Sequence, residues 1–205
     1  DATMGALMDD EGQIAVMPSV AEAIARVPTG KAAGYSPISG SPPFLDAVRR
    51  DLLGNSDLLP KSVAVTTPGG SGAIYQAIKN FVEPGHQALT TDYYWGPYPV
   101  IAQHLERDVS TFGMFSPDLS FDLEAMKRGI RQHIDTQGRL LLILNFPCHN
   151  PTGYSLDLGE WMSIAEVVRT AGEEAPVAVL LDLAYHRFGG ESADLWIDAV
   201  PTMLE

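Results

Sequence analysis

Apolar positions along the chain follow two spacings that alternate from residue 63 to residue 182. Short runs rich in Val, Ile and Leu are typical of strands buried on both faces, and longer stretches with apolar residues every three or four positions are typical of amphipathic helices. The pattern predicts strands at 63–65, 87–91, 109–112, 140–145 and 177–182. It predicts helices at 20–27, 43–53, 72–82, 97–106, 122–134 and 158–169.

Strands that alternate with helices of this length favour an α/β fold, in which a mainly parallel mixed sheet lies between two layers of helices. Ligands of such open sheets bind at the carboxyl ends of the strands. A strand buried on both faces is accessible only at its ends. Polar residues that follow the predicted strands are therefore the candidate site.

The segment T-T-P-G-G-S-G joins the strand 63–65 to the next helix. Gly69 and Gly70 allow the backbone to approach a ligand closely, and Ser71 adds a hydroxyl. Because the N-terminus of a helix favours an anion, a phosphate is the expected ligand. The same glycines are equally compatible with an ordinary tight turn. The segment matches neither the dinucleotide fingerprint nor the Walker loop, which disfavours those cofactors.

Asp182 ends the apolar run V-A-V-L-L-D. A carboxylate there is costly unless a cation or several donors meet it, and a protonated ring nitrogen would satisfy it. The alternatives are a cap on the next turn and an ion pair with Arg187. Tyr185, three residues further on, either directs its hydroxyl into the same site or packs in the core.

Two more candidates lie in loops after predicted strands. Asn150 precedes Pro151 in H-N-P-T-G, where its side-chain amide can donate to an anionic ligand oxygen, although these are also common turn residues. Trp95 lies in Y-Y-W-G-P-Y, where its indole either stacks on a flat ring or packs in the core. Trp161 and Trp196 are expected to pack in the core.

Composition narrows the possible functions. The 205 residues are 45% hydrophobic, and 13 Lys and Arg against 26 Asp and Glu give a net charge of −13. This charge disfavours nucleic acid and anionic membranes as partners and leaves small-molecule chemistry. The single cysteine, Cys148, fits a cytoplasmic protein. The five histidines lack the spacing of a metal site, no G-x-S-x-G elbow supports a serine hydrolase, and no apolar stretch is long enough to span a membrane.

The motifs W-G, H-N-P-T-G and D-L-A-Y follow, in this order, the strands predicted at 87–91, 140–145 and 177–182. Together they resemble the large domain of the aspartate aminotransferase family, fold type I enzymes that use pyridoxal 5'-phosphate (PLP). The resemblance covers nearly the whole chain. It implies that Gly70 and Ser71, with Gly69 beside them, bind the cofactor phosphate and that Trp95 stacks on the pyridine ring.

The same resemblance implies the other cofactor contacts. Asn150 and Tyr185 would hydrogen-bond to the phenolate oxygen of PLP. Asp182 would pair with the pyridine nitrogen and keep it protonated, so that the ring acts as an electron sink. Tyr35, in Y-S-P-I-S-G, matches a tyrosine that reaches the phosphate in the neighbouring subunit, and the expected protein is therefore a homodimer.

Gly5 matches a family glycine whose backbone approaches the substrate near the small domain. The expected substrate contacts are Gly5, Trp95 and Asn150. Residues 1–14 are accordingly expected to form a strip of the N-terminal small domain. Residues 15–205 are expected to form a PLP-binding large domain that is incomplete at its C-terminal end.

Two departures from the family pattern affect the expected site. Family members have a histidine three positions after the stacking tryptophan, where it supports the ring-binding aspartate, whereas this chain has Tyr98. The family's Schiff-base lysine lies several tens of residues beyond the D-x-A-Y segment, and the chain ends at Glu205 before that point. The chain is therefore expected to be a fragment, without the catalytic lysine and without the arginines that clamp the substrate carboxylates.

The full-length protein is expected to be a cytoplasmic aminotransferase. It would move an amino group between an amino acid, of the aspartate or aromatic type, and a 2-oxo acid. One alternative is another fold type I PLP enzyme, such as a β-lyase or a decarboxylase. The other is an aminotransferase-like ligand-sensing domain of a transcription regulator.

Overall fold

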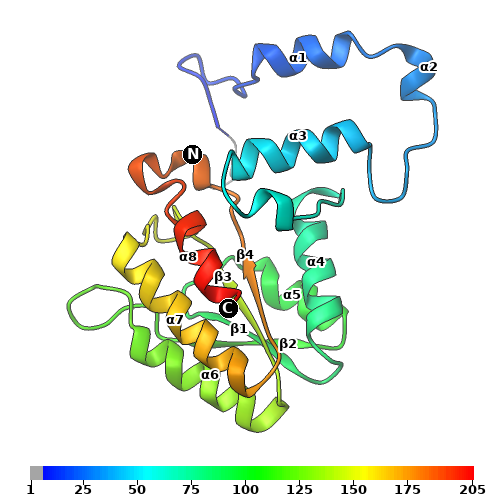
Figure 1. Ribbon diagram of the computed structural model, residues 1–205. Helices are drawn as coiled ribbons and strands as arrows, with labels where there is room; N and C mark the ends of the chain where they lie inside the picture. The colour runs from blue at the N-terminus through cyan, green and yellow to red at the C-terminus, as the bar shows by residue number, and fades with distance from the viewer. Residues whose placement is uncertain (1–6) are drawn as a thin grey trace. The chain divides into compact units, whose positions relative to one another are not determined.

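Four parallel strands form a single sheet (Figure 1). The computed structural model describes residues 7–205, and the chain divides into two units, Asp1–Pro42 and Pro43–Glu205, of which the second contains the sheet. The parallel pairings confirm the predicted α/β fold class. The spatial order of the strands is β2 (Asp108–Phe112), β1 (Gln87–Thr91), β3 (Leu140–Leu144) and β4 (Val177–Leu181).

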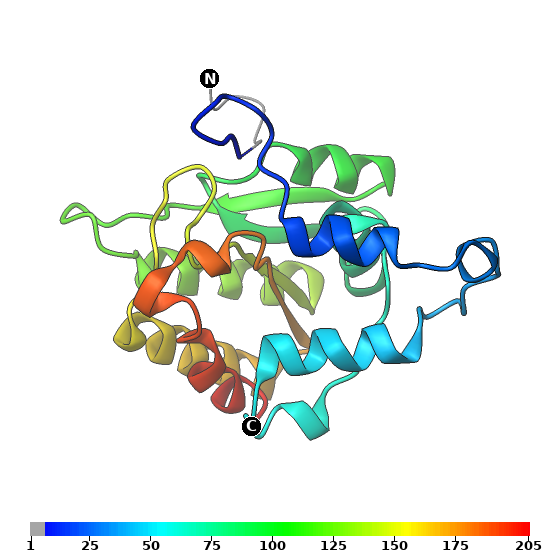
Figure 2. The ribbon, with the colours of Figure 1, turned by 90° about the horizontal axis from the view of Figure 1, so that it is seen from above.

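Helices cover both faces of the sheet. One face carries α4 (Gly69–Phe81) and α5 (Pro97–His104), and the other carries α6 (Leu123–Gln137) and α7 (Leu158–Glu174). The unpredicted helix α8 (Trp196–Met203) lies beside α7 in both views (Figure 1, Figure 2). The three layers are those expected from the alternating pattern, although α6 and α7 extend further than predicted.

The chain has a hydrophobic core on each face of the sheet, and the side chains of β3 contribute to both. Leu140, Leu142 and Leu144 pack with α6, α7 and α8, whereas Leu141 and Ile143 pack with α4 and α5. Alternate residues of a strand point to opposite faces of a sheet, and all five side chains are at most 2% exposed. β3 is therefore buried on both faces, as its continuous apolar sequence predicts.

The strand β4 has a similarly apolar sequence but a different environment. It pairs only with β3 among residues 7–205, and all five of its residues are half-buried. The prediction of burial on both faces is therefore confirmed for β3 and wrong for β4 in the described chain.

The predicted strand at 63–65 is also wrong. The segment lies between the short 3-10 helix η1 (Leu59–Lys61) and α4, and it has no strand partner among residues 7–205. Val63 is 92% exposed and Val65 is 67% exposed. An apolar pattern leads to a strand only where the backbone of another strand lies beside it, because strand propensity depends on neighbouring strands.

Strands that follow β1 in the sequence are added on both sides of it. β2 lies on one side of β1 and β3 on the other, so the connections through α5 and α7 run over opposite faces. In open α/β sheets, a ligand crevice forms at the carboxyl ends of the strands where such a reversal occurs. The loops that follow β1 and β3 flank this crevice.

A buried polar network connects α6 to β1 and β2. His133 is 4% exposed, its Nε2 lies 2.5 Å from Ser110 Oγ, and its Nδ1 lies 2.9 Å from Gln137 Nε2. The backbone N–H of Gln87 donates to Gln137 Oε1 (2.7 Å), which orients that amide. Gln137 Nε2 therefore donates to His133 Nδ1, and the imidazole proton is on Nε2. Burial lowers the pKa of His133 and favours this neutral form.

A glycine ends the helix α3 (Pro42–Leu53). Gly54, with φ of +54°, ends the predicted helix 43–53, and its N–H donates to Arg50 O (2.9 Å).

Among the described helices, none is long and apolar enough to cross a bilayer. The assignment of residues 1–14 to a separate domain remains a prediction. The other elements are α1 (Pro18–Ala25), α2 (Thr29–Ala32), α3 (Pro42–Leu53), η2 (His186–Phe188) and η3 (Gly190–Ser192).

Candidate functional site

Asp182 directly follows β4, and two donors hold its carboxylate. Oδ2 accepts a hydrogen bond from the Tyr98 hydroxyl (2.6 Å), and Oδ1 accepts one from the Ala184 backbone N–H (3.2 Å). The alternative in which the Asp182 carboxylate caps the next turn is thus partly right, because it accepts from the Ala184 N–H. Arg187 binds Asp51 (2.6 Å) and not Asp182, so the ion-pair alternative is wrong. A carboxylate has about four acceptor positions, which leaves Asp182 able to accept from a further donor such as a protonated ring nitrogen.

Tyr98 connects the predicted residues Trp95 and Asp182. It lies in the first turn of α5, is fully buried, and meets the half-buried Trp95 indole edge-on, with 5.6 Å between the ring centroids. Burial, and then the charge of Asp182, raises the pKa of Tyr98 well above its ordinary value. The phenol therefore remains a neutral hydrogen-bond donor to Asp182 in the neutral pH range.

Asn145 connects the ends of β3 and β4 to the loop that carries Asn150. It is 4% exposed, its Nδ2 donates to the Asp182 carbonyl (2.8 Å), and its Oδ1 accepts from the Asn150 backbone N–H (2.8 Å). The Asn150 side chain has no hydrogen-bond partner among residues 7–205, which leaves it available to a ligand. Sequence reasoning missed Asn145, although one polar residue at the end of L-L-L-I-L-N was a usable signal.

His149 anchors the same loop to the end of β1. Its Nε2 lies 3.2 Å from Thr91 Oγ1, its Nδ1 lies 2.9 Å from Thr152 Oγ1, and its ring packs on Phe146 at 5.1 Å between centroids. His149 is 2% exposed, and burial is the main reason that its pKa lies below the ordinary value. Sequence reasoning missed this role because Thr91 lies 58 positions earlier. We call residues 145–154 the braced loop.

Residues 66–71, which we call the glycine turn, have fewer anchoring contacts. α4 begins at Gly69, whose φ is +68°, and the Thr67 hydroxyl donates to the Gly69 carbonyl (2.9 Å). The N–H groups of Gly70 and Ser71 have no acceptor among residues 7–205, and a Cβ on Gly70 would meet nothing within 4 Å. Because free N–H groups at a helix N-terminus attract anions, a phosphate is complementary to this turn.

The N-terminus of α4 is directed toward the same edge of the sheet as Asp182. The helix packs on β3 and β4, and a short connection leads from Phe81 to Gln87 at the amino end of β1. The first turn of α4 therefore lies toward the carboxyl-terminal edge of the sheet (Figure 1). The glycine turn, Trp95, Asn150 and Asp182 are thus brought to one edge of the sheet.

No contact in the described structure tests the roles of the three other predicted residues. Tyr185 is 38% exposed, and its hydroxyl has no hydrogen-bond partner among residues 7–205. Tyr35 belongs to the first unit and is fully exposed. Gly5 lies outside the described residues. The roles of these three residues therefore remain predictions.

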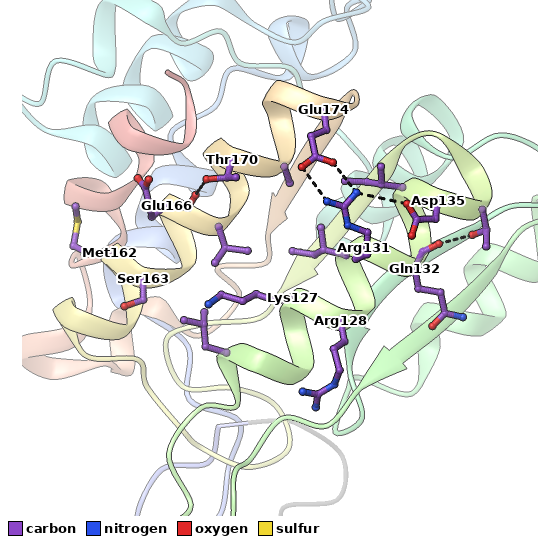
Figure 3. Close-up of a pocket in the computed structure, with 16 residues that line it drawn as sticks. Lys127, Arg128, Arg131, Gln132, Asp135, Met162, Ser163, Glu166, Thr170 and Glu174 are labelled. Atoms are coloured by element: carbon purple, nitrogen blue, oxygen red, sulfur yellow. Dashed lines mark hydrogen bonds and ion pairs between the residues drawn. The ribbon is translucent and has the colours of Figure 1, made fainter.

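A large groove in the described chain lies elsewhere, between α6 and α7 (Figure 3). Its volume is about 1150 Å³, and its lining includes the ion pair between Arg131 and Glu174 (2.7 Å) and the nearby Asp135. The lining residues of this groove in the described chain include none from the glycine turn or the braced loop, and neither Trp95 nor Asp182. The candidate site is therefore formed by the side chains that converge at the edge of the sheet, and this groove is separate from it.

Comparison with known proteins identifies the family. The family model for aminotransferase class I and II matches residues 3–203. The chain belongs to this family. The aromatic-amino-acid aminotransferase of Paracoccus denitrificans is 30% identical over 193 residues, which cover 92% of this chain and 47% of that protein. The aspartate aminotransferase of Pseudomonas aeruginosa is 28% identical over 201 residues, which cover 91% of this chain and 47% of that protein.

A solved structure supports the same assignment. The crystal structure of an aminotransferase from Anaerococcus prevotii matches with a TM-score of 0.85 and 31% identity, and the match covers 93% of this chain and 48% of that chain. The chain spans about half the length of the curated relatives it matches. The names of these relatives favour an aminotransferase over the lyase, decarboxylase and regulator alternatives.

The residues of this chain fit PLP, the cofactor that the family implies. The free N–H groups of Gly70 and Ser71 suit a phosphate, and the Asp182 carboxylate suits a protonated ring nitrogen. The half-buried Trp95 supplies a flat apolar surface. Residues 7–205 contain no group of three or more His, Cys, Asp and Glu that could hold a metal ion.

Proposed function

We propose that the full-length protein is a PLP-dependent aminotransferase that moves an amino group between an amino acid and a 2-oxo acid. The observation that carries the proposal is the Asp182 carboxylate, which Tyr98 and Ala184 hold at the end of β4, with Trp95 packed against Tyr98. An anion fixed in this way is complementary to a cationic aromatic ring. Membership of the aminotransferase family supports the same function.

Each part of the cofactor has a proposed partner in the chain. The backbone N–H groups of the glycine turn bind the phosphate, and Asn150 and Tyr185 hydrogen-bond to the phenolate oxygen. Trp95 covers one face of the pyridine ring and excludes water from it, while Asp182 holds the proton on the ring nitrogen. When bound, PLP supplies an electron sink for the carbanion at the substrate α-carbon.

An amino acid of the aspartate or aromatic type is the proposed substrate. Relatives named aromatic-amino-acid, aspartate and tyrosine aminotransferases support this substrate class. Gly5, Trp95 and Asn150 are the proposed substrate contacts. We further propose a cytoplasmic homodimer, in which Tyr35 reaches the cofactor phosphate of the neighbouring subunit.

Spectroscopy of the full-length protein tests the proposed function. After reconstitution with PLP, the protein should show a cofactor absorbance band that changes on borohydride treatment. Given an amino acid without a 2-oxo acid, it should convert PLP into pyridoxamine 5'-phosphate, which separates an aminotransferase from a lyase or a decarboxylase. A full-length protein that binds no PLP contradicts the proposal.

The variant Asp182→Ala tests the central residue. Because a hydrogen bond to a charged group is lost, the dissociation constant for PLP should rise about 100-fold. The matched control is Asp57→Asn, which changes an exposed carboxylate without a hydrogen-bond partner among residues 7–205. Equal affinities of the two variants for PLP, measured by fluorescence titration, contradict the assigned role of Asp182.

A further inference from the structure

We propose that the groove between α6 and α7 binds an amphipathic helix of a partner protein. The partner helix has an apolar stripe, with acidic side chains along one flank and basic side chains along the other. The lining residues of the groove in the described chain include none of the proposed cofactor contacts. The inference is therefore independent of the proposed function.

The floor of the groove is apolar and is fixed to the core beneath it. Leu123 and Ile134 of α6 and Val167 of α7 are half-buried and pack against the core on this face of the sheet. Ile130 and Ala171, which also line the groove, are 3% and 7% exposed. On each helix these positions are four or seven residues apart, so they lie on one face of it. The floor is therefore preformed by folding.

The groove has the dimensions of a half-embedded helix. The lining residues of α6 extend from Leu123 to Thr136, which is about 20 Å along the helix axis. A helix with its side chains is about 10–12 Å in diameter, so half of such a cylinder over this length occupies about 800–1100 Å³. The volume of the groove is about 1150 Å³. An apolar helix face that lies in a groove between helices is a common mode of recognition between proteins.

The two rims of the groove differ in charge (Figure 3). The charged lining residues of α6 are mainly basic and those of α7 are acidic. They are Lys127, Arg128, Arg131 and Asp135 of α6, and Glu166 and Glu174 of α7. A partner helix with acids facing α6 and bases facing α7 complements both rims. A partner with the same charge on both flanks is repelled by one of them.

The rim charges are accessible to a partner although they already form ion pairs. Lys127 pairs with Glu124, and Glu166 pairs with Arg169, each within its own helix. The side chains of Lys127 and Glu166 are still 44% and 58% exposed. Exposed pairs of this kind contribute little to stability, so the charges of a partner can join or replace them at small cost.

Other occupants fit the groove less well. An anionic amphiphile such as a fatty acid is repelled by Glu166 and Glu174, and the net charge of −13 disfavours an anionic membrane surface. A second copy of the chain that presents the same face brings another hollow and no ridge to fill this one. A helix with both signs of charge is therefore the occupant that the groove favours.

Binding of designed helical peptides to the full-length protein tests the inference. Three peptides of about 14 residues, long enough to span the groove, share one leucine stripe. Their flanks carry Glu and Lys on opposite sides, Glu on both sides, or Lys on both sides. Fluorescence anisotropy at physiological ionic strength should show the mixed peptide binding about tenfold more tightly than either of the others. Equal or weaker binding of the mixed peptide overturns the inference.

A charge reversal on one rim locates the peptide in the groove. In Glu166→Lys, the affinity of the mixed peptide relative to the all-Glu peptide should fall about fivefold, because the acidic rim is partly reversed. The matched control is Asp57→Lys, the same change of charge at an exposed position outside the groove, and it should alter this ratio less than about twofold. Equal effects of the two variants overturn the inference.

The same variants distinguish the other occupants. The thermal midpoints of the variants are measured first, and if Glu166→Lys does not fold, Glu166→Gln is used and should change the ratio in the same direction. A fluorescent fatty acid whose binding is abolished by Lys127→Glu identifies an amphiphile site and overturns the inference. A homodimer that dissociates in Lys127→Glu, measured by sedimentation, identifies a contact between copies and overturns it as well.

Discussion

The braced loop and the glycine turn lie at the same edge of the sheet but are stabilised in different ways. Two buried side chains, Asn145 and His149, connect the braced loop to the ends of β1, β3 and β4. The glycine turn has free N–H groups and open space beside Gly70. Polar groups that are satisfied within the protein are fixed by folding, whereas free donors require water or a ligand. Substitutions in the braced loop should therefore change stability, and those in the glycine turn should change ligand binding.

The largest effect is expected for Asn145→Ala. The substitution leaves the Asp182 carbonyl and the Asn150 N–H without their partner and should lower the free energy of unfolding by about 3 kcal/mol. Urea denaturation measures the change, and the exposed Asn55→Ala is the control. A loss below about 1 kcal/mol would show that Asn145 does not brace the loop.

A smaller loss of stability is expected for Thr91→Val. The substitution keeps the shape of the buried side chain but removes the hydroxyl that donates to the Tyr93 carbonyl and contacts His149. It should lower the free energy of unfolding by about 1.5 kcal/mol. Thr111→Val, at an exposed position of the neighbouring strand, is the matched control in the same denaturation experiment. Equal changes for the two variants would contradict the proposed link between β1 and the braced loop.

Acidification should loosen the braced loop through His149. Burial lowers the pKa of His149 and of His133 in the folded protein, so below about pH 6.5 the unfolded chain binds more protons than the folded chain. The stability that neutral His149 contributes is therefore complete above about pH 6.5 and is lost as the pH falls toward the pKa of His149 in the folded protein. The free energy of unfolding falls by about 1.4 kcal/mol for each unit by which the folded and unfolded pKa values differ. Denaturation at a series of pH values should show a shallower dependence for His149→Gln than for wild type, and identical slopes would contradict this prediction.

The smallest effect on stability is expected in the glycine turn. Gly70→Ala should change the free energy of unfolding by less than about 0.5 kcal/mol, because its Cβ meets no atom within 4 Å. The same Cβ should weaken PLP binding, because it enters the space proposed for the phosphate. Gly69→Ala should instead lose about 1 kcal/mol of stability, because the φ of Gly69 is +68°. Unfolding and PLP titration of both variants check the contrast, and a large loss of stability in Gly70→Ala would contradict it.

The sequence predicted those parts of the fold that depend on local pattern. The alternation of strands and helices gave the layers, and Gly54 gave the end of α3. The burial of β4 and the pairing of Val63 and Val65 depend on which strands are neighbours. Periodicity carries no information about neighbours, so an apolar run was taken as a buried strand in both cases.

The candidate site was predictable to a similar extent. Asp182, Asn150 and Trp95 became candidates because each lies in a loop after a strand of an open α/β sheet. Their contacts with a ligand remain predictions. Asn145 and His149 were missed because their roles depend on partners that folding brings from other strands. A sequence pattern therefore indicates which polar residues follow the strands more readily than which residues hold the loops in place.

The Ser110–His133 pair shows how a main-chain group can decide the chemistry of a side-chain dyad. The hydroxyl oxygen and the imidazole Nε2 lie 2.5 Å apart, within hydrogen-bond reach as in a hydroxyl nucleophile and its base. The backbone N–H of Gln87, acting through the Gln137 amide, places the imidazole proton on the nitrogen that faces Ser110. The imidazole Nε2–H therefore donates a hydrogen bond to the Ser110 oxygen, and this nitrogen cannot accept the serine proton. A search for hydrolytic centres by distance alone would select this pair, although its imidazole cannot act as the base.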